Sequence, residues 1–359
     1  MFRVVKRTDL LKRQSVIFRL VAILAALATS GIFLMILGFN PLKVYLSMLD
    51  GSFGSAYRFK EAIIKTIPLV VTSLGISVAF RMKFWNIGAE GQIIMGAFGA
   101  SYFALFFNQL PAVVLIPLMM VAALVAGGLW ALIPAFFKAQ FGTNETLFTL
   151  MMNYIAIKWI NYLQYGPWKD PKALGFGKIA MFKDNTLMPK LFGIHIGWIL
   201  AIVLVIVMYI FINKTKRGYE IQVIGESENT ARYAGMNVKK IILSSLFLSG
   251  AICGLVGMFQ VSGVNGTLTY QVANGVGYTA IITTWLASLS APLIVVVCFL
   301  FAVLQQGGTF IQTAFQIPAS AAQLIQGLIL FFVLGSEFFI QYKLVLKDKT
   351  DSAKVKEAA

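Results

Sequence analysis

Ten long apolar runs, separated by short polar segments, constrain the fold of this 359-residue chain more than any other feature. A transmembrane helix needs about 20 mostly apolar residues, and most of the runs approach or exceed that length. The runs are Val16–Leu37, Ala62–Phe80, Gly88–Phe107, Pro111–Phe137, Glu145–Leu163, Ile194–Ile212, Ile241–Val261, Gly277–Leu289, Pro292–Phe315 and Ala321–Ile340. The eighth run is short and rich in Thr and Ser, so it is either a full span or a re-entrant segment. The pattern predicts an all-α polytopic membrane protein with about ten transmembrane helices.

The composition supports lipid as the solvent for most of the chain. Hydrophobic residues make up 58% and charged residues 12%, whereas soluble domains have roughly 45–50% and about 25%. These values exclude a water-soluble enzyme, a DNA-binding protein and a disordered tail protein. Small residues four apart, such as Gly250 and Gly254, are typical of closely packed membrane helices. We predict a basic N-terminal tail (1–15), a transmembrane domain (16–342) and a C-terminal tail (343–359).

The distribution of Lys and Arg predicts the orientation of the chain. With both termini in the cytoplasm, the cytoplasmic segments hold 20 of these residues and the outer segments hold 8, as the positive-inside rule requires. The outer loop 164–191 is the one poor fit, because it carries five lysines. We therefore interpret the net charge of +16 as topology and predict no nucleic-acid partner. The first apolar run has no small-residue cleavage signature, so we expect a retained helix and not a signal peptide.

Residues for catalysis or metal binding are absent from the sequence pattern. Cys253 and Cys298 lie inside apolar runs, and His195 is the single histidine, so we expect neither a disulfide framework nor a metal site. The sequence has no nucleophile–base pair, no P-loop and no GxGxxG motif. We predict that the chain is not an enzyme and that a gradient or a partner protein supplies its energy.

Polar residues gather at the start of the third run. Asn86, Glu90 and Gln92 lie within seven residues that also contain two glycines. Polar groups inside a bilayer are costly and usually face a cavity or a partner. Asn86, Glu90 and Gln92 could therefore line a solute pathway. Alternatively, Asn86 is a helix N-cap and Glu90 lies in the first turn, where the helix dipole favours an anion.

A second polar cluster opens the fifth run. Asn144 or Thr143 can cap this helix, Glu145 can lie in its first turn, and Asn153 follows about two turns further in. The Asn153 side chain is either a ligand of the solute or an interhelical hydrogen-bonding group. The residues that we predict for the solute pathway are Asn86, Glu90, Gln92, Asn144, Glu145 and Asn153.

The cytoplasmic loop 214–240 contains a predicted short helix, from Ser227 to Ala234. Acidic residues lie at its start, where the dipole tolerates them, and Gly235 follows as a stop. This helix either docks in a shallow groove of a cytoplasmic partner or is an ordinary solvated loop helix. Docking would rely on the small side chains of Ala231 and Ala234 and on Arg232 as a cation. The candidate docking residues are Glu226, Ser227, Glu228, Asn229, Ala231, Arg232, Ala234 and Gly235.

Three motifs occur in the order of one known family. They are the segment 86–92, the segment 142–146 with Met152-Asn153-Tyr154, and Gly225-Glu226 followed by 231–235. Together they resemble the membrane permease subunits of bacterial ABC importers for branched-chain amino acids, simple sugars and nucleosides. The outer-loop segment 166–171 looks most like the nucleoside branch. The resemblance extends from about residue 60 to residue 340.

The resemblance implies a multi-pass permease in the bacterial cytoplasmic membrane, paired with a homologous or identical second permease. It also implies a cytoplasmic ATPase, which would hold the ATP and magnesium, and an extracytoplasmic binding lipoprotein or periplasmic protein. No cofactor is expected in this chain, and helix 227–235 becomes the predicted coupling helix. The implied cargo is a nucleoside, with a simple sugar or riboflavin as the alternative. A different class remains open, an ion-coupled secondary transporter with Glu90 or Glu145 as the proton or cation ligand.

Overall fold

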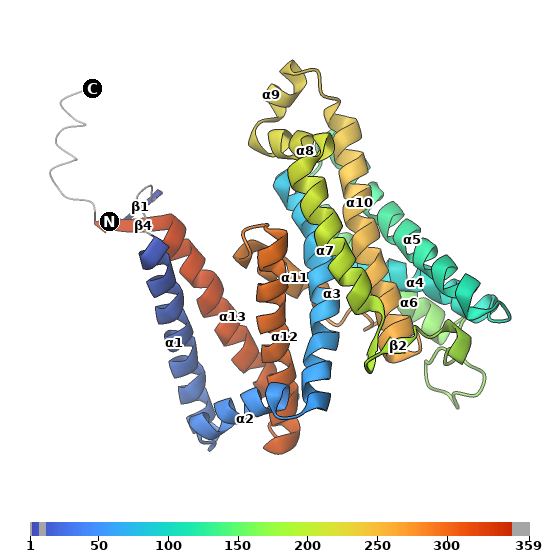
Figure 1. Ribbon diagram of the computed structural model, residues 1–359, viewed down its shortest axis with the longest axis horizontal. Coiled ribbons are helices and arrows are strands. Elements are labelled where there is room, and N and C mark those ends of the chain that lie inside the picture. Colours follow the sequence, from blue (N-terminus) through green and yellow to red (C-terminus); the bar gives the residue numbers. More distant parts are fainter. Residues whose placement is uncertain (1, 7–11, 347–359) are drawn as a thin grey trace. The chain divides into compact units, whose positions relative to one another are not determined.

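The computed structural model describes residues 2–6 and 12–346, and it consists of two compact units (Figure 1). One unit combines the chain up to residue 55 with the chain from residue 304, and the other contains residues 56–303. Parts of the predicted tails, residues 1, 7–11 and 347–359, lie outside the described residues. The cytoplasmic location of both tails therefore stays a prediction.

The first unit contains α1 (Lys12–Ile36), α2 (Pro41–Phe53), the end of α12 (Ala291–Ala314) and α13 (Ala319–Gln341). Strands β1 (Phe2–Lys6) and β4 (Tyr342–Leu346) pair antiparallel, so part of each predicted tail is a strand. Helix α2 was not predicted. It begins where the Asn40 side chain accepts hydrogen bonds from two backbone N–H groups, and it turns by 113° from α1. Buried aliphatic residues of all these helices form one core: Leu34, Val44, Met48, Ile311, Ile317, Ala322 and Ile325.

The second unit contains most of the predicted spans. Its helices are α3 (Ala56–Arg81), α4 (Ala89–Phe106), α5 (Ala112–Phe141), α6 (Glu145–Tyr165), α7 (Gly197–Lys214), α8 (Lys216–Glu226), α9 (Glu228–Tyr233), α10 (Val238–Met258), α11 (Val276–Leu286) and the first part of α12. A π-helical segment η2 (Phe259–Asn265) continues α10. The outer loop between α6 and α7 contains a 3-10 turn, η1 (Asp184–Thr186), and a small hairpin of β2 (Lys190–Leu191) and β3 (Ile194–His195).

Helices α4, α5 and α10 pack with their backbones close together. A Cβ atom at Gly96 would collide with the backbone of Gly254, and one at Gly127 would collide with the backbone of Gly250. Only glycine permits such an approach, which in lipid gives dispersion contacts that a larger side chain would prevent. The predicted small-residue faces are thus the interface of the central three helices.

Each of the ten predicted runs contains a helix, which confirms an all-α polytopic membrane protein. Among the described residues, six helices are long and apolar enough to cross a membrane, or seven if the bent pair α1–α2 is one span. The number of ten spans stays a prediction. Helix α11, at 11 residues, is about 16 Å long, which is roughly half of the hydrocarbon thickness. The sixth run starts later than predicted, because Ile194 and His195 belong to β3.

Candidate functional site

The carboxylate of Glu90 caps the first turn of α11. Its Oε1 accepts a hydrogen bond from the Gly275 N–H, and its Oε2 accepts one from the Gly277 N–H, both at 2.8 Å. Glu90 is buried, and Gly275 has a φ of 77°, in the left-handed region that glycine adopts without strain. The carboxyl group thus lies at the positive end of the α11 dipole. Glu90 of α4 therefore holds a helix that begins 185 residues later.

Asn153 joins α6 to α4 and α11. Its Oδ1 accepts a hydrogen bond from the Gly91 N–H at 2.8 Å, and its Nδ2 donates to the Ile87 carbonyl at 2.9 Å. Nδ2 also lies 3.2 Å from the Tyr278 hydroxyl, to which it donates. The side chain is fully buried. The structure thus shows the interhelical hydrogen bond that was one of the two interpretations of this residue.

The side chains of Asn86 and Gln92 form two hydrogen bonds with each other at the start of α4. The Asn86 Oδ1 accepts from the Gly88 N–H at 3.0 Å and from the Gln92 Nε2 at 3.1 Å. The Asn86 Nδ2 donates to the Gln92 Oε1 at 3.3 Å and to the Ser249 Oγ at 3.4 Å. The prediction of Asn86 as the N-cap was wrong, because Gly88 occupies that position. Asn86 lies two residues earlier, where its side chain closes a turn and reaches α10.

Asn144 caps α6 as predicted. Its Oδ1 accepts from the backbone N–H groups of Thr146 and Leu147 at 3.0 and 3.2 Å, whereas the buried Thr143 hydroxyl has no hydrogen-bond partner among the described residues. Glu145 lies in the first turn and pairs with Lys138 of α5 at 2.8 Å. The ion pair closes the α5–α6 corner. These two residues thus stabilise a helix–helix connection.

The predicted pathway residues form a framework that positions α4, α6 and α11. Five of the six are buried, and Asn144 is the exposed one. Their hydrogen bonds and ion pairs are made within the chain. The role of these residues in solute movement stays a prediction. In such a role they would act by positioning helices.

The face of α6 that is exposed on the surface of the chain, here called its outward face, was not predicted as a site. Tyr154 and Tyr162 are 55% and 61% exposed, and Lys158 between them is exposed as well. The three residues are four apart and share one face with Trp159, around a shallow hollow. Lys158 lies about 20 Å along the helix from Glu145 and about 10 Å from Tyr165, within the predicted run Glu145–Leu163. The spacing of these residues was the signal in the sequence.

The neighbouring helix α5 presents a different outward face. Its exposed large side chains in the middle of the span are apolar, among them Val121, Val125 and Leu129. Such a face suits lipid. A face with a lysine and two tyrosines suits lipid less, because a charged group in hydrocarbon costs about 3 kcal/mol on insertion scales. We conclude that α5 and α6 face different surroundings.

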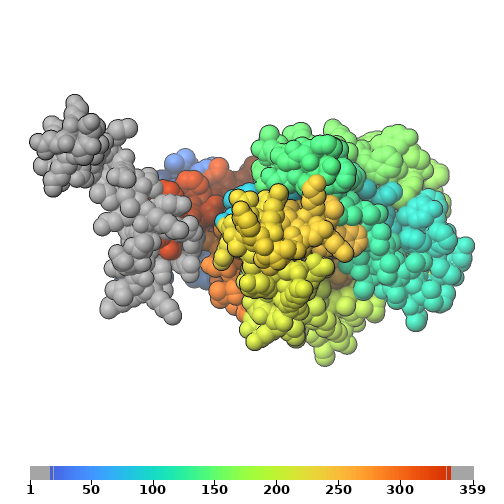
Figure 2. Space-filling model, turned by 90° about the horizontal axis from the view of Figure 1, so that it is seen from above, coloured from blue at the N-terminus to red at the C-terminus, as the bar shows by residue number. Residues whose placement is uncertain are grey.

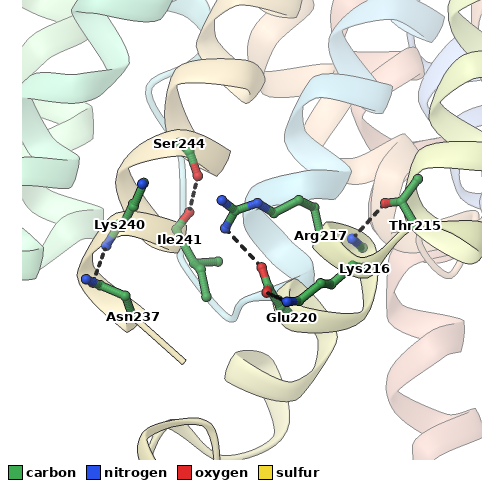
Figure 3. Close-up of polar contacts among 9 residues, drawn as sticks. Thr215, Lys216, Arg217, Glu220, Asn237, Lys240, Ile241 and Ser244 are labelled. Carbon is green, nitrogen blue, oxygen red and sulfur yellow. Dashed lines mark hydrogen bonds and ion pairs between the residues drawn. The ribbon is translucent and has the colours of Figure 1, made fainter. Parts of the chain in front are cut away.

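The segment between α7 and α10 is held by ion pairs and helix caps (Figure 3). The Thr215 hydroxyl accepts from the Gly218 N–H at 3.1 Å and caps α8, and Asn237 Oδ1 accepts from the Lys240 N–H at 3.0 Å and caps α10. Glu220 pairs with Arg217 at 2.9 Å and lies 4.0 Å from Lys216. Both ion pairs lie within α8, so they stabilise it as a helix.

Helix α8 is seated against the end of α3. A Cβ atom at Gly225 would collide with the Arg81 carbonyl oxygen. The Arg81 side chain in turn donates from Nη2 to the Leu289 carbonyl at 2.7 Å, just after α11 ends. The α8 segment is therefore in contact with α3, and α3 with α11.

Helix α9 confirms the predicted short helix, although one of its small residues faces inward. Ser227 caps it by accepting from the Thr230 N–H at 3.2 Å, and Gly235 ends it with a φ of 74°. Ala231 is fully buried within the chain, so the expectation that it seats on a partner was wrong. Tyr233 is 95% exposed. Figure 2 shows the α8–α9 segment, yellow-green to yellow, at the front of the face seen there.

Arg232 and Ala234 complete the exposed surface of α9. Arg232 pairs with Glu228 at 2.7 Å, and both side chains are largely exposed to solvent. An exposed pair of this kind contributes little stability and can exchange partners. Ala234 is exposed. The docking role of the segment stays a prediction, and its exposed surface consists of Glu226, Glu228, Asn229, Thr230, Arg232, Tyr233, Ala234 and Gly235.

Comparison with known proteins assigns the family. Residues 59–334 match the family described as the branched-chain amino acid transport system, permease component. The chain is 33% identical to a glucose ABC transporter permease of Haloferax volcanii, over 89% of this chain and 87% of that protein. It is 30% identical to a guanosine ABC transporter permease of Bacillus subtilis, with 88% and 92% covered. It is 28% identical to a nucleoside ABC transporter permease of Lactococcus lactis, with 97% of both chains covered. The chain therefore belongs to the family of branched-chain amino acid-type ABC permease components.

Proposed function

We propose that the chain is the membrane-spanning subunit of an ATP-driven importer in the bacterial cytoplasmic membrane, and that its cargo is a nucleoside. It would pair with a second permease, homologous or identical. A separate cytoplasmic ATPase would hold ATP and magnesium, and an extracytoplasmic binding lipoprotein or periplasmic protein would deliver the solute. The guanosine and nucleoside permeases that resemble most of this chain support the choice of cargo.

The outward face of α6 carries this proposal. Tyr154 and Tyr162 offer flat aromatic rings, and Lys158 offers a charged donor between them. A nucleobase stacks on aromatic side chains with about 1–3 kcal/mol per base, and its ring nitrogens and carbonyl groups accept hydrogen bonds. Ribose hydroxyls would pair with the phenol groups. We infer that this face lines the solute pathway, and that the second permease closes its other side.

A continuous series of contacts supports coupling between the cytoplasmic end and this face. A partner that displaces α9 would move α8, which abuts the Arg81 backbone at Gly225. Arg81 holds the carbonyl end of α11, and Glu90 holds its amino end. Tyr278 of α11 meets Asn153 on the inner face of α6. We infer that ATP-driven motion reaches α6 by this route, as a coupling between rigid elements.

Glucose is the second candidate cargo, because the glucose permease of Haloferax volcanii is 33% identical to this chain. Sugars also lie against aromatic rings, so the α6 face is compatible with both solutes. The ion-coupled alternative has less support. Glu90 already accepts two backbone hydrogen bonds and Glu145 already pairs with Lys138, so both acids are engaged within the chain.

Uptake of labelled guanosine tests the proposal. The chain is expressed with its ATPase, second permease and binding protein in a strain that lacks its own nucleoside uptake, and glucose and riboflavin are added as competitors. We expect saturable guanosine uptake that requires the ATPase and resists both competitors. Competition by glucose alone would identify a sugar importer. Uptake that persists with an inactive ATPase and stops with an ionophore would identify an ion-coupled transporter.

A further inference from the structure

A groove lies between α3, α7 and the start of α12 on the second unit. It has a volume of about 330 Å³, within the range of small-molecule sites. Its exposed lining is wholly apolar, because neither Thr66 nor the Trp198 indole exposes a polar atom to it. The lining residues are Ile63, Thr66, Ile67, Val70, Leu191, Phe192, Ile194, Trp198, Ala201, Ile202, Val205 and Val295.

The groove lies at the end of the bundle opposite α8. It begins at the β2–β3 hairpin, which Figure 1 shows far from α8, and it continues along α3 from Ile63 to Val70. From Lys60 to Val70 the helix advances about 15 Å, which is the depth of one leaflet of the hydrocarbon core. In the predicted orientation this is the outer leaflet. The dimensions therefore match an acyl chain that enters from the membrane surface.

The rim of the groove is positively charged. The Lys60 side chain lies across the hairpin turn, where a Cβ atom built on Gly193 would be 3.2 Å from its Nζ. Lys190 lies on β2 of the same hairpin. The acidic neighbour Glu61 interacts with Lys65, one turn further along α3. Two lysines beside an apolar groove at a membrane surface complement a phosphate with an acyl chain attached.

We propose that this groove is a binding site for an anionic phospholipid, with its acyl chain between α3 and α7 and its phosphate at Lys60 and Lys190. The proposal concerns the lipid-facing side of the unit and is independent of the cargo. Phosphatidylglycerol would then be a bound component of the folded permease as well as a lipid of the surrounding bilayer.

Native mass spectrometry of the full chain tests the site, with phosphatidylglycerol or phosphatidylcholine added to protein in mild detergent. Ala201→Trp fills the groove, since Ala201 is 6% exposed and lines it, and we expect retained phosphatidylglycerol to fall at least tenfold. Val207→Trp is the matched control, because Val207 lies on the same helix, is 50% exposed and does not line the groove. It should retain the lipid as the unaltered chain does.

Two charge variants keep the test valid even if Ala201→Trp fails to fold. Lys60→Ala and Lys190→Ala should each weaken phosphatidylglycerol binding about fivefold, the change that corresponds to about 1 kcal/mol per basic side chain at a membrane surface. Binding of phosphatidylcholine should change less. Lys172→Ala, in the same outer loop, is the control. Equal retention of both lipids, unchanged binding in the lysine variants, or a disulfide from Ile202→Cys to a second permease would overturn the proposal.

Discussion

The two faces of α6 differ in a way that the polarity of the sequence does not reveal. On the inner face, Asn153 is fully buried and makes three hydrogen bonds to α4 and α11. On the outer face, Tyr154, Lys158 and Tyr162 are exposed around a hollow. The inner polar group is satisfied within the chain and builds the framework. The outer groups need a polar environment from outside the chain, which makes them the better candidates for contact with a solute.

The largest expected effect comes from breaking the inner framework. Glu90→Ala removes the acceptor of two buried N–H groups at the start of α11, and unsatisfied buried groups cost about 1–3 kcal/mol each. We expect a loss of about 2–5 kcal/mol of stability, measured as a lower melting temperature in detergent. Glu90→Gln keeps an acceptor and should lose less. If Glu90→Gln melts normally but does not transport, the carboxylate acts in the solute pathway and the distinction between the two faces fails.

The second effect concerns the outer face. Lys158→Leu removes a charge that lipid disfavours, so the protein should remain folded, while guanosine uptake should fall at least tenfold, equivalent to about 1.4 kcal/mol. Initial rates over a range of guanosine concentrations give this value, and Lys158→Arg should restore part of it. Val125→Leu, on the lipid-facing side of α5, is the control. Normal uptake by Lys158→Leu would assign the outer face to contact with another subunit.

The third effect compares the two sides of α9. Tyr233→Ala changes a side chain that is 95% exposed, so it should lower co-purification of the ATPase about fivefold without changing the melting temperature. Ala231→Trp, in contrast, should destabilise the chain, because Ala231 is fully buried and overpacking costs about 1–3 kcal/mol. Pull-down and thermal unfolding measure the two quantities. Normal assembly of Tyr233→Ala together with Ala234→Trp would place the docking surface elsewhere.

The smallest expected effect concerns His195, a buried residue that, unlike Asn153, has a ring nitrogen without a hydrogen-bond partner among the described residues. The His195 Nδ1 has no partner among the described residues, and burial together with the charge of Lys190 lowers the pKa of His195 to about 4. The unfolded chain then takes up a proton below pH 6.5 and the folded chain does not, so stability falls as the pH falls from 6.5 towards 4. We expect a loss of about 1 kcal/mol at pH 5.5. His195→Phe should abolish this part of the pH dependence of the melting temperature, and an unchanged profile would contradict it.

Local features of the sequence predicted much of this structure. The apolar runs located the membrane helices because burial in lipid requires continuous apolar segments. The Asn144 cap and the α9 helix with Gly235 were predictable because capping depends on a few neighbouring residues. Helix α2 was missed, since at 13 residues it is too short for a span.

Features that depend on distant residues were beyond the sequence. Glu90 is 185 residues from Gly275, and no local pattern indicates that one caps the other. The burial of Ala231 and the exposure of Lys158 likewise depend on how helices pack. Sequence reasoning singled out the polar residues of the apolar runs, but only the three-dimensional structure shows which partners they have within the chain.

The capping of α11 by Glu90 also has a consequence for how the chain is made. Synthesis proceeds from the N-terminus, so the acid of α4 is in the membrane long before residues 275–277 leave the ribosome. Helix α11 has only 11 residues, too few to be inserted as an independent span. We therefore expect α11 to enter the second unit only once Glu90 is in position, as a short helix added to a site that earlier helices have already formed.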